Sequence, residues 1–243
     1  MTKLSRRVVD NLSEIPAALR FLWALRFGPV RELWIGDSHA VSFNRPGTYG
    51  TFVTGPQGQV IHRLGARLMW SLARQGFPRS SQRLAALVAR LGRPGRFVPV
   101  FVAGEVDVRC HLVEHPDTDF GFVAEYVERC RELGRRLGAD GVYLAVPPPP
   151  CGWPPDRVVY PVVGTISERL EVFARLRAAL HDAVAAYADV ELLDFTDLIE
   201  DRDGALRLDH TDDGCHTNDA AIRLIRERIG HRLRPAGSQK AAS

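Results

Sequence analysis

One stretch of this sequence decides how the rest is interpreted, and it reads Leu33-Trp34-Ile35-Gly36-Asp37-Ser38-His39-Ala40. Its first part is apolar, as in a buried strand, and it breaks abruptly into a polar Gly-Asp-Ser turn. Open α/β proteins bind their ligands at the carboxyl ends of the strands. The stretch therefore predicts a strand over 32–36 that holds the hydroxyl of Ser38 at such an edge.

The composition is that of an ordinary globular protein, with 243 residues of which 45% are hydrophobic and 25% are charged. We expect one domain over residues 1–233, with a helical extension over 1–30, and a disordered tail over 234–243. The net charge of +3 is small and the basic residues are spread out, so no nucleic-acid partner is predicted. Because no apolar run reaches the roughly 18 residues of a membrane span and no cleavage site follows the N-terminal apolar patch, we expect a cytoplasmic protein without a membrane span.

The cysteines do not indicate a metal site or a disulfide framework. None belongs to a Cys-x-x-Cys pair, and none has finger-like spacing to histidines. We expect free thiols, no bound metal and no other cofactor. The residues concerned are Cys110, Cys130, Cys151 and Cys215.

Hydrophobic periodicity along the chain alternates between strands and helices. Apolar runs predict strands over 32–36, 51–54, 97–103, 141–146 and 190–195. Helical spacing predicts helices over 4–27, 60–76, 84–91 and 118–137, one from Thr165 and one after Asn218. Thr165 and Glu168 have the spacing of a capping box, and Asn218 can cap the last helix. Because each crossover is long enough for a helix, we expect a three-layer α/β/α sandwich with a five-stranded parallel sheet.

Near the other end of the chain, Asp213-Gly214-Cys215-His216 offers the partners that a serine nucleophile needs. An aspartate three residues before a histidine can fold its carboxylate back onto Nδ1 of the imidazole. Nε2 is then free to take a proton from a hydroxyl. Asp-x-x-His is common by chance, and it acquires meaning here only together with Gly36-Asp37-Ser38.

With Gly-Asp-Ser after the first strand and Asp-x-x-His before the last helix, the chain resembles the SGNH/GDSL hydrolase superfamily over roughly residues 30–232. The resemblance implies an SGNH-like, flavodoxin-like fold and a small-molecule acyl substrate. It implies that Ser38 attacks an ester carbonyl, with His216 as the base and Asp213 as its orienting group. It also implies an oxyanion hole from the amide of Ser38 and a second-block glycine, for which Gly55 is the best match and Gly58 the second choice.

The third block departs from the family pattern. Family members typically carry Gly-x-Asn-Asp, whose asparagine donates to the oxyanion, but Gly104-Glu105-Val106-Asp107 has a valine in that place. Loss of one such donor typically costs about 10²–10³ in turnover. The chain therefore resembles a divergent branch with a Gly-Asp-Ser-His first block and a Gly-Glu-x-Asp-x-Arg third block.

Polar residues downstream of this block are candidates for substrate binding. If the segment stays extended, alternate side chains from 105 to 111 share one face. Arg109 or His111 can then supply the missing electrophile, or Arg109 can bind a carboxylate or phosphate. The alternative is an exposed strand end whose charges pair with one another. With the two residues that flank Ser38, the predicted substrate-binding set is Asp37, His39, Glu105, Asp107, Arg109 and His111.

Four other interpretations remain open at the level of sequence. An acyltransferase uses the same three residues and differs in excluding water. A metal-dependent phosphoesterase can draw ligands from Asp37, His39 and the carboxylates of the third block, although the expected Asn-His dipeptide is missing. An α/β-hydrolase fits poorly, because Ser38 follows the first strand of the chain. A non-catalytic relative is favoured only by Val106.

Overall fold

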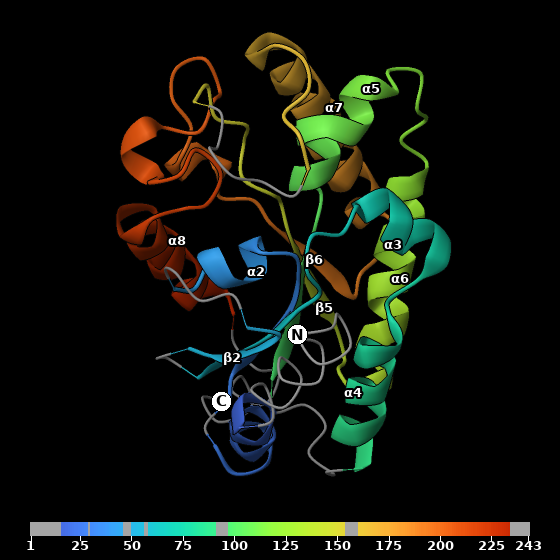
Figure 1. Ribbon diagram of the computed structural model, residues 1–243. Coiled ribbons are helices and arrows are strands. Elements are labelled where there is room, and N and C mark those ends of the chain that lie inside the picture. The colour runs from blue at the N-terminus through green and yellow to red at the C-terminus, as the bar shows by residue number, and fades with distance from the viewer. Residues whose placement is uncertain are drawn as a thin grey trace, which may run out of the picture.

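The fold is built on one six-stranded sheet with helices on both faces (Figure 1). The computed structural model describes residues 16–28, 30–45, 50–55, 58–90, 97–153 and 160–233. The strands are β1 (Glu32–Gly36), β2 (Phe52–Thr54), β3 (Gln59–Arg63), β4 (Val98–Val102), β5 (Val142–Ala145) and β6 (Val190–Leu193). Their order in the sheet is β2-β3-β1-β4-β5-β6, and all neighbours are parallel except β2 and β3.

The middle of the sheet is formed by β1 and β4, whose residues are buried at every position. Strands that are covered on both faces are apolar throughout rather than alternating, which explains the continuous apolar runs in the sequence. Gly36 ends β1 where the backbone of β4 passes very close. A Cβ atom at this position would collide with the carbonyl oxygen of Val102, so the turn that carries Ser38 begins at a residue that only glycine can fill.

The helices form the two outer layers of the sandwich, as Figure 1 shows. One layer contains α3 (Met69–Gln75), α4 (Arg79–Arg90), α6 (Phe122–Arg136) and α7 (Ile166–Ala185), and it shares a hydrophobic cluster with a helix over residues 16–27. The other layer contains α2 (His39–Ser42) and α8 (Asp219–Arg232), which pack on Trp34 and Val100. The short elements are η1 (Asp107–His111), α5 (Leu112–Glu114), η2 (Thr196–Leu198) and η3 (Leu208–His210). The predicted three-layer α/β/α architecture is confirmed.

The number of strands differs from the prediction because one strand lies in a segment that was predicted as a helix. The repeat beginning at Val60 predicts a helix over 60–76, but residues 59–63 form β3 and the helix begins only at Met69. β3 lies between β1 and β2 and is buried at all positions but its last. A short buried run has no period of its own, so spacing alone does not separate strand from helix. The predicted second strand is instead the antiparallel edge strand β2.

Two helix starts follow the capping signals in the sequence. The Oγ1 atom of Thr165 accepts the N–H of Glu168 at 3.2 Å, and the Glu168 carboxylate accepts the N–H of Thr165 at 2.7 Å, which confirms the capping box of α7. The Oδ1 atom of Asn218 accepts the N–H groups of Ala220 and Ala221 and so caps α8. The four cysteines are free and buried.

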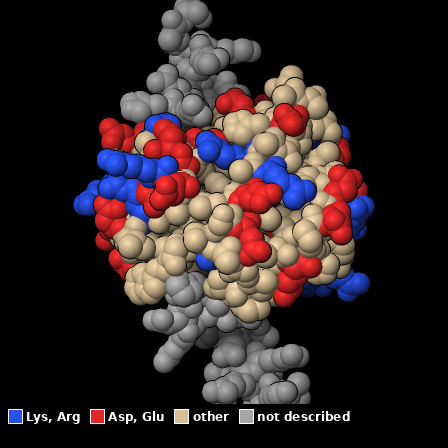
Figure 2. Space-filling model, turned by 90° about the horizontal axis from the view of Figure 1, so that it is seen from above, with Lys and Arg blue, Asp and Glu red and all other residues tan. Residues whose placement is uncertain are grey.

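Several predictions concern residues that the structure does not describe. These are the first part of the helix predicted over 4–27, the tail over 234–243 and the last two residues of the proline-rich loop over 147–155. Among the described helices, none combines the length and the apolar character needed to cross a bilayer. Seen from above, the described surface mixes acidic and basic residues without one large patch of a single sign (Figure 2).

Candidate active site

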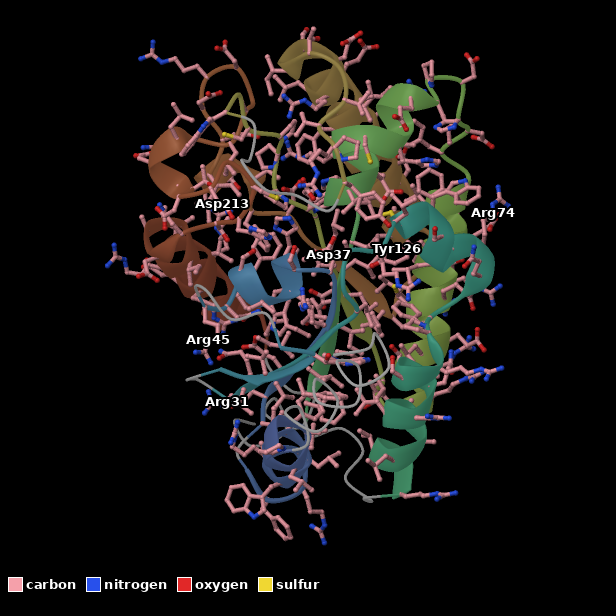
Figure 3. All side chains as sticks on the ribbon, viewed as in Figure 1. Arg31, Asp37, Arg45, Arg74, Tyr126 and Asp213 are labelled. Atoms are coloured by element: carbon pink, nitrogen blue, oxygen red, sulfur yellow. The ribbon has the colours of Figure 1, made fainter. Side chains whose placement is uncertain are left out.

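The carboxyl edge of the sheet brings Ser38 into contact with the loop that precedes α8. Ser38 follows β1 and lies at the start of α2, and its Oγ atom is 2.8 Å from Nε2 of His216. The Nδ1 atom of the same imidazole is 2.7 Å from Oδ2 of Asp213. In Figure 3, Asp37 and Asp213 lie in the upper part of the molecule, whereas Arg31, which precedes β1, lies toward the lower edge. The three residues that the family resemblance implies as catalytic therefore form one chain of hydrogen bonds.

Backbone contacts fix Asp213 as the acceptor of this chain. Its Oδ1 atom accepts the N–H of Cys215 at 2.9 Å and that of His216 at 2.7 Å, while Oδ2 faces the imidazole. Burial raises the pKa of Asp213, but the hydrogen bonds and the charge of His216 outweigh burial and hold this pKa well below its usual range. An ionised Asp213 keeps the proton on Nδ1 of His216, so Nε2 is the atom that can receive the proton of Ser38.

His39 packs against His216 rather than lining an open pocket. Its ring is fully buried and stacks on the ring of His216, with centroids 5.1 Å apart. Its Nε2 atom is 3.7 Å from Oε2 of Glu105. Burial alone lowers the pKa of His39, but the carboxylates of Glu105 and Asp37 outweigh it and raise this pKa. The predicted substrate contact for His39 is therefore replaced by a role beneath the imidazole of His216.

Asp37 is also turned inward and does not face a substrate. Its Oδ1 atom accepts the N–H of His39 at 2.9 Å, a contact that shapes the turn at Ser38. Oδ2 is buried and has no hydrogen-bond partner among the described residues. Burial raises the pKa of Asp37. The predicted substrate-binding role of Asp37 is corrected to one of shaping the nucleophile turn.

The segment that follows the third block is helical, so the prediction of an extended face is wrong. Residues 107–111 form a π-helical turn that continues into α5. Helical backbone spreads neighbouring side chains around an axis, and only residues about one turn apart stay together. Glu105 and Arg109 satisfy that spacing, and Arg109 Nη2 lies 3.4 Å from Glu105 Oε2. Of the four polar residues, these two are the ones that the structure places beside Cys215 and His39.

Asp107 and His111 serve other parts of the structure. Both carboxylate oxygens of Asp107 accept backbone N–H groups of α3, from Met69 at 2.6 Å and from Trp70 at 3.1 Å. Burial, the larger effect, raises the pKa of Asp107 to about 7 despite these hydrogen bonds. The His111 ring packs against Trp70 and His115. Both residues are thus corrected from substrate contacts to packing contacts, because the helical turn directs them away from Arg109.

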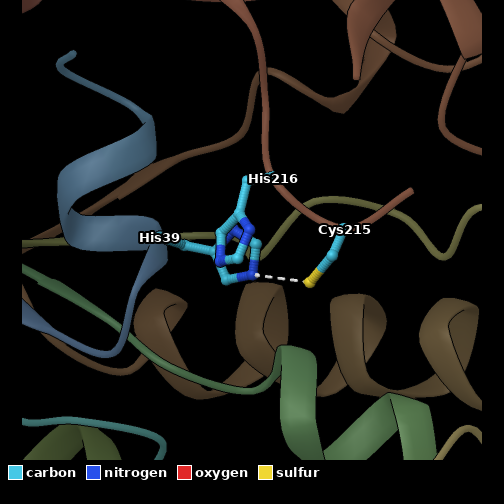
Figure 4. Close-up of side chains that lie close together, drawn as sticks. All are labelled: His39, Cys215 and His216. Carbon is cyan, nitrogen blue, oxygen red and sulfur yellow. Dashed lines mark hydrogen bonds between the residues drawn. The ribbon is translucent and has the colours of Figure 1, made fainter. Parts of the chain in front are cut away.

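His216 and two neighbouring side chains place three donor atoms close together (Figure 4). His39, Cys215 and His216 place nitrogen and sulfur atoms within 4.8 Å of one another, a spacing at which these atom types can bind a metal ion. However, Arg109 Nη1 donates to Cys215 Sγ at 3.4 Å, and this guanidinium charge repels a cation. Burial raises the pKa of the Cys215 thiol and keeps it protonated. These contacts favour a packing role for His39 and the protonated thiol of Cys215 beside His216 over a metal centre.

Comparison with known proteins identifies the fold. No protein-family model matches the sequence, and no curated protein matches it. Among solved structures, a protein from Streptococcus pneumonia described as a platelet activating factor aligns with 96% of this chain and 100% of its own, with a TM-score of 0.56 and 16% identity. A GDSL-like lipase from Bacteroides thetaiotaomicron aligns with 84% of this chain and 87% of its own, with a TM-score of 0.56 and 15% identity. This chain has the GDSL-like hydrolase fold.

A third solved structure agrees with this identification. A protein from Bacteroides fragilis described as an acylhydrolase aligns with 84% of this chain and 88% of its own, with a TM-score of 0.53 and 17% identity. The fold predicted from the two short motifs is thus confirmed. The α/β-hydrolase alternative fits poorly, because Ser38 follows β1, the first of the described strands.

Within the GDSL-like fold, Gly55 lies at the wrong edge of the sheet to serve Ser38. Its N–H donates to the carbonyl of Gln59, and Gln59 is paired with Glu32, the first residue of β1. Ser38 follows the last residue of β1 and therefore lies at the opposite edge. Gly58 is at the same wrong edge, because its carbonyl accepts the N–H of Arg31. Both candidates are corrected, and the reason is that β2 runs antiparallel to its neighbours.

Gly65 is the glycine that the GDSL-like topology brings beside the nucleophile turn. It follows β3, and the N–H of Leu64 donates to the carbonyl of Gly36 at 2.6 Å. Its φ of +77° requires glycine. The sequence does not single out Gly65, because the repeat that begins at Val60 predicts a helix where β3 lies. The signal that could have found it is a glycine directly after a short buried run.

Proposed function

We propose that this protein is a serine esterase that cleaves an acyl ester of a small molecule through an acyl-enzyme. The observation that carries the proposal is the continuous hydrogen-bond chain from Ser38 Oγ to His216, at 2.8 Å, and from His216 to Asp213, at 2.7 Å. A serine is a weak nucleophile unless an oriented base takes its proton, and this geometry supplies such a base. No metal or other cofactor enters the proposed steps.

In the first half of the reaction, Ser38 Oγ attacks the ester carbonyl carbon while its proton passes to Nε2 of His216. The carbonyl oxygen becomes an oxyanion, and the backbone N–H groups of Ser38 and Gly65 are the donors we assign to it. When the intermediate collapses, the bond from carbon to the alcohol oxygen breaks, and that oxygen takes the proton from His216. Ser38 is then an ester, and the alcohol leaves.

In the second half, a water molecule attacks the acyl carbon and gives its proton to His216. Collapse breaks the bond to Ser38 Oγ, which recovers the proton, and the acid leaves. Asp213 keeps the imidazole oriented in both halves and stabilises its charged form. Val106 is buried and carries no polar side-chain atom, so the proposed oxyanion hole rests on backbone donors.

The test is intact-mass measurement after incubation with 4-nitrophenyl acetate and 4-nitrophenyl butyrate. We expect wild type to gain the mass of the acyl group and Ser38→Ala to gain none. Ser42→Ala is the matched control, because Ser42 lies on the same helix α2 but is buried against His39. An adduct that persists in Ser38→Ala contradicts the proposal. The proposal is also contradicted if a chelator abolishes activity while a fluorophosphonate fails to label Ser38. That result would support a metal-dependent phosphoesterase.

A further inference from the structure

A narrow cavity lies next to the catalytic histidine, and the proposed ester cleavage does not use it. Four segments form its walls. The helical segment after Gly104 contributes Glu105 and Arg109, and the proline-rich loop contributes Pro149 and Cys151. Arg169 comes from the first turn of α7, and Cys215 comes from the loop before His216. Its volume of about 10 Å³ is roughly that of a single water-sized group. Because Cys215 is adjacent to His216 in sequence, an occupant of this cavity is close to the base.

Two arginines in the wall are buried to an unusual degree. Arg109 is 7% exposed and Arg169 is 6% exposed. Buried guanidinium groups are normally matched by carboxylates, because an unmatched buried charge is costly. Arg109 lies 3.4 Å from Glu105, whereas Arg169 has no carboxylate within ion-pair distance among the described residues. Its Nη1 donates only to the carbonyl of Cys151, at 3.3 Å.

The hydrogen-bond donors of these arginines are also incompletely used. The Nε atoms of Arg109 and Arg169 are both buried and have no partner in the described part of the chain. Glu105 balances one of the two positive charges, and its carboxylate also faces His39. Counting the described residues alone, the cavity wall therefore keeps one uncompensated positive charge and two N–H donors without a partner, which is the complement of a small anion.

We infer that this cavity binds a carboxylate on the same molecule that carries the scissile ester, so that the substrate is an anionic ester. The inference rests on the proposed esterase function and specifies its substrate class. The cavity admits a group the size of one oxygen atom, so one oxygen of the carboxylate enters it between Arg109 and Arg169. The ester then lies toward Ser38.

Binding measured on the Ser38→Ala protein tests this inference without turnover. Monoethyl succinate carries an ester and a carboxylate, and diethyl succinate is its neutral counterpart. By calorimetric titration we expect the monoester to bind about tenfold or more tightly than the diester, as charged hydrogen bonds predict. Adding Arg169→Gln should abolish that preference. Adding Arg175→Gln should preserve it, because Arg175 lies on the same helix α7 but stacks on Phe120 outside the cavity.

A second arm uses turnover by the wild-type protein. The ratio of kcat/KM for 4-nitrophenyl hemisuccinate to that for 4-nitrophenyl acetate should fall about tenfold or more in Arg169→Gln and stay constant in Arg175→Gln. A merely structural role for Arg169 would lower both rates together and leave the ratio unchanged, which would overturn the inference. Displacement of monoethyl succinate by inorganic phosphate at lower concentrations than by acetate would also overturn the assignment to a carboxylate.

The two arms separate failure of this inference from failure of the proposed function. An acyl adduct on Ser38 without any preference for the monoester means that the protein is an esterase and that the cavity does not bind a carboxylate. A preference for the monoester that depends on Arg169, without an adduct on Ser38, means that the anion site stands and the esterase proposal fails.

Discussion

The guanidinium of Arg226 on α8 binds the carboxylate of Glu32 on β1 through two hydrogen bonds of 2.7 Å each. The same carboxylate accepts the indole N–H of Trp34 at 2.8 Å, and Arg226 also donates to Asn44. β1 leads directly to Ser38, and α8 follows directly after the Asp213–His216 loop. This buried ion pair therefore joins the two segments whose meeting assembles the catalytic chain.

Removal of one partner should be costly. In Arg226→Met, Glu32 is left buried without its cation, and we expect the free energy of unfolding to fall by about 3–5 kcal/mol. Urea denaturation measures this change. Arg228→Met is the matched control on the same helix, because Arg228 pairs with the half-exposed Asp197. Its expected cost is about 1 kcal/mol or less, and an equal loss in the two variants would refute the role given to the buried pair.

Asp213→Asn should impair turnover without displacing the loop. The asparagine fits the same space but has no negative charge beside Nδ1 of His216. The imidazole then loses the group that orients it and that stabilises it once it has taken the proton of Ser38. We expect kcat to fall about 10³–10⁴-fold while the melting temperature changes little. Asp212→Asn, next to it in sequence, removes a carboxylate that contacts Asn218 rather than the imidazole, and it should leave kcat near the wild-type value. Comparable rates for the two variants would exclude Asp213 from catalysis.

Two glycines with nearly equal φ values allow a test of the oxyanion hole. Gly65 has a φ of +77° and Gly76 a φ of +76°, and a Cβ atom at either position would meet no atom within 4 Å. Because side chains rarely adopt such a φ, replacement of either by alanine should cost stability, roughly 1–3 kcal/mol. Only Gly65→Ala should also lower kcat, by about tenfold or more, because it shifts the amide assigned to the oxyanion. If kcat is equal in Gly65→Ala and Gly76→Ala, Gly65 is not part of the hole.

The buried Asp107 should make stability depend on pH in a characteristic direction. Its pKa rises from an ordinary value of 3.8 to about 7 on folding, so the folded protein favours the protonated carboxyl. That contribution is fully present below about pH 4 and is lost as the pH rises to about 7. Asp107→Asn does not titrate. The free energy of unfolding of wild type relative to this variant should therefore decline over that range, by up to about 4 kcal/mol, and level off above it.

Urea denaturation at several pH values between 4 and 8 measures this difference. A constant difference across the range would mean that Asp107 remains ionised in the folded protein. The KM of Asp107→Asn provides the second readout. A residue that only caps α3 affects stability, whereas a residue that contacts substrate affects KM. A rise in KM without loss of stability would restore the original prediction that Asp107 binds substrate.

The comparison of sequence and structure separates two kinds of information. Local signals were sufficient where the physical cause is local: the apolar runs of β1 and β4, the capping box at Thr165 and the cap at Asn218 all appear as expected. Signals that depend on a neighbour in space failed. The spacing after Val60 predicts a helix where β3 lies, because the burial of β3 comes from the strands on either side. The sequence favours Gly55 for the oxyanion hole because the residues of β2 do not reveal that this strand is antiparallel.

The sequence by itself determined most of the alternation of strands and helices, and it predicted Ser38, Asp213 and His216 as the residues of the proposed site, since these depend on residue type and on short spacings. Only the tertiary structure decided which other groups join them. The helical turn after Gly104 separates Asp107 and His111 from Arg109. The contact of Arg169 with the carbonyl of Cys151 brings this arginine of α7 to the same cavity as Arg109. That juxtaposition comes from packing between segments distant in the chain, and hydrophobic burial rather than local propensity determines it.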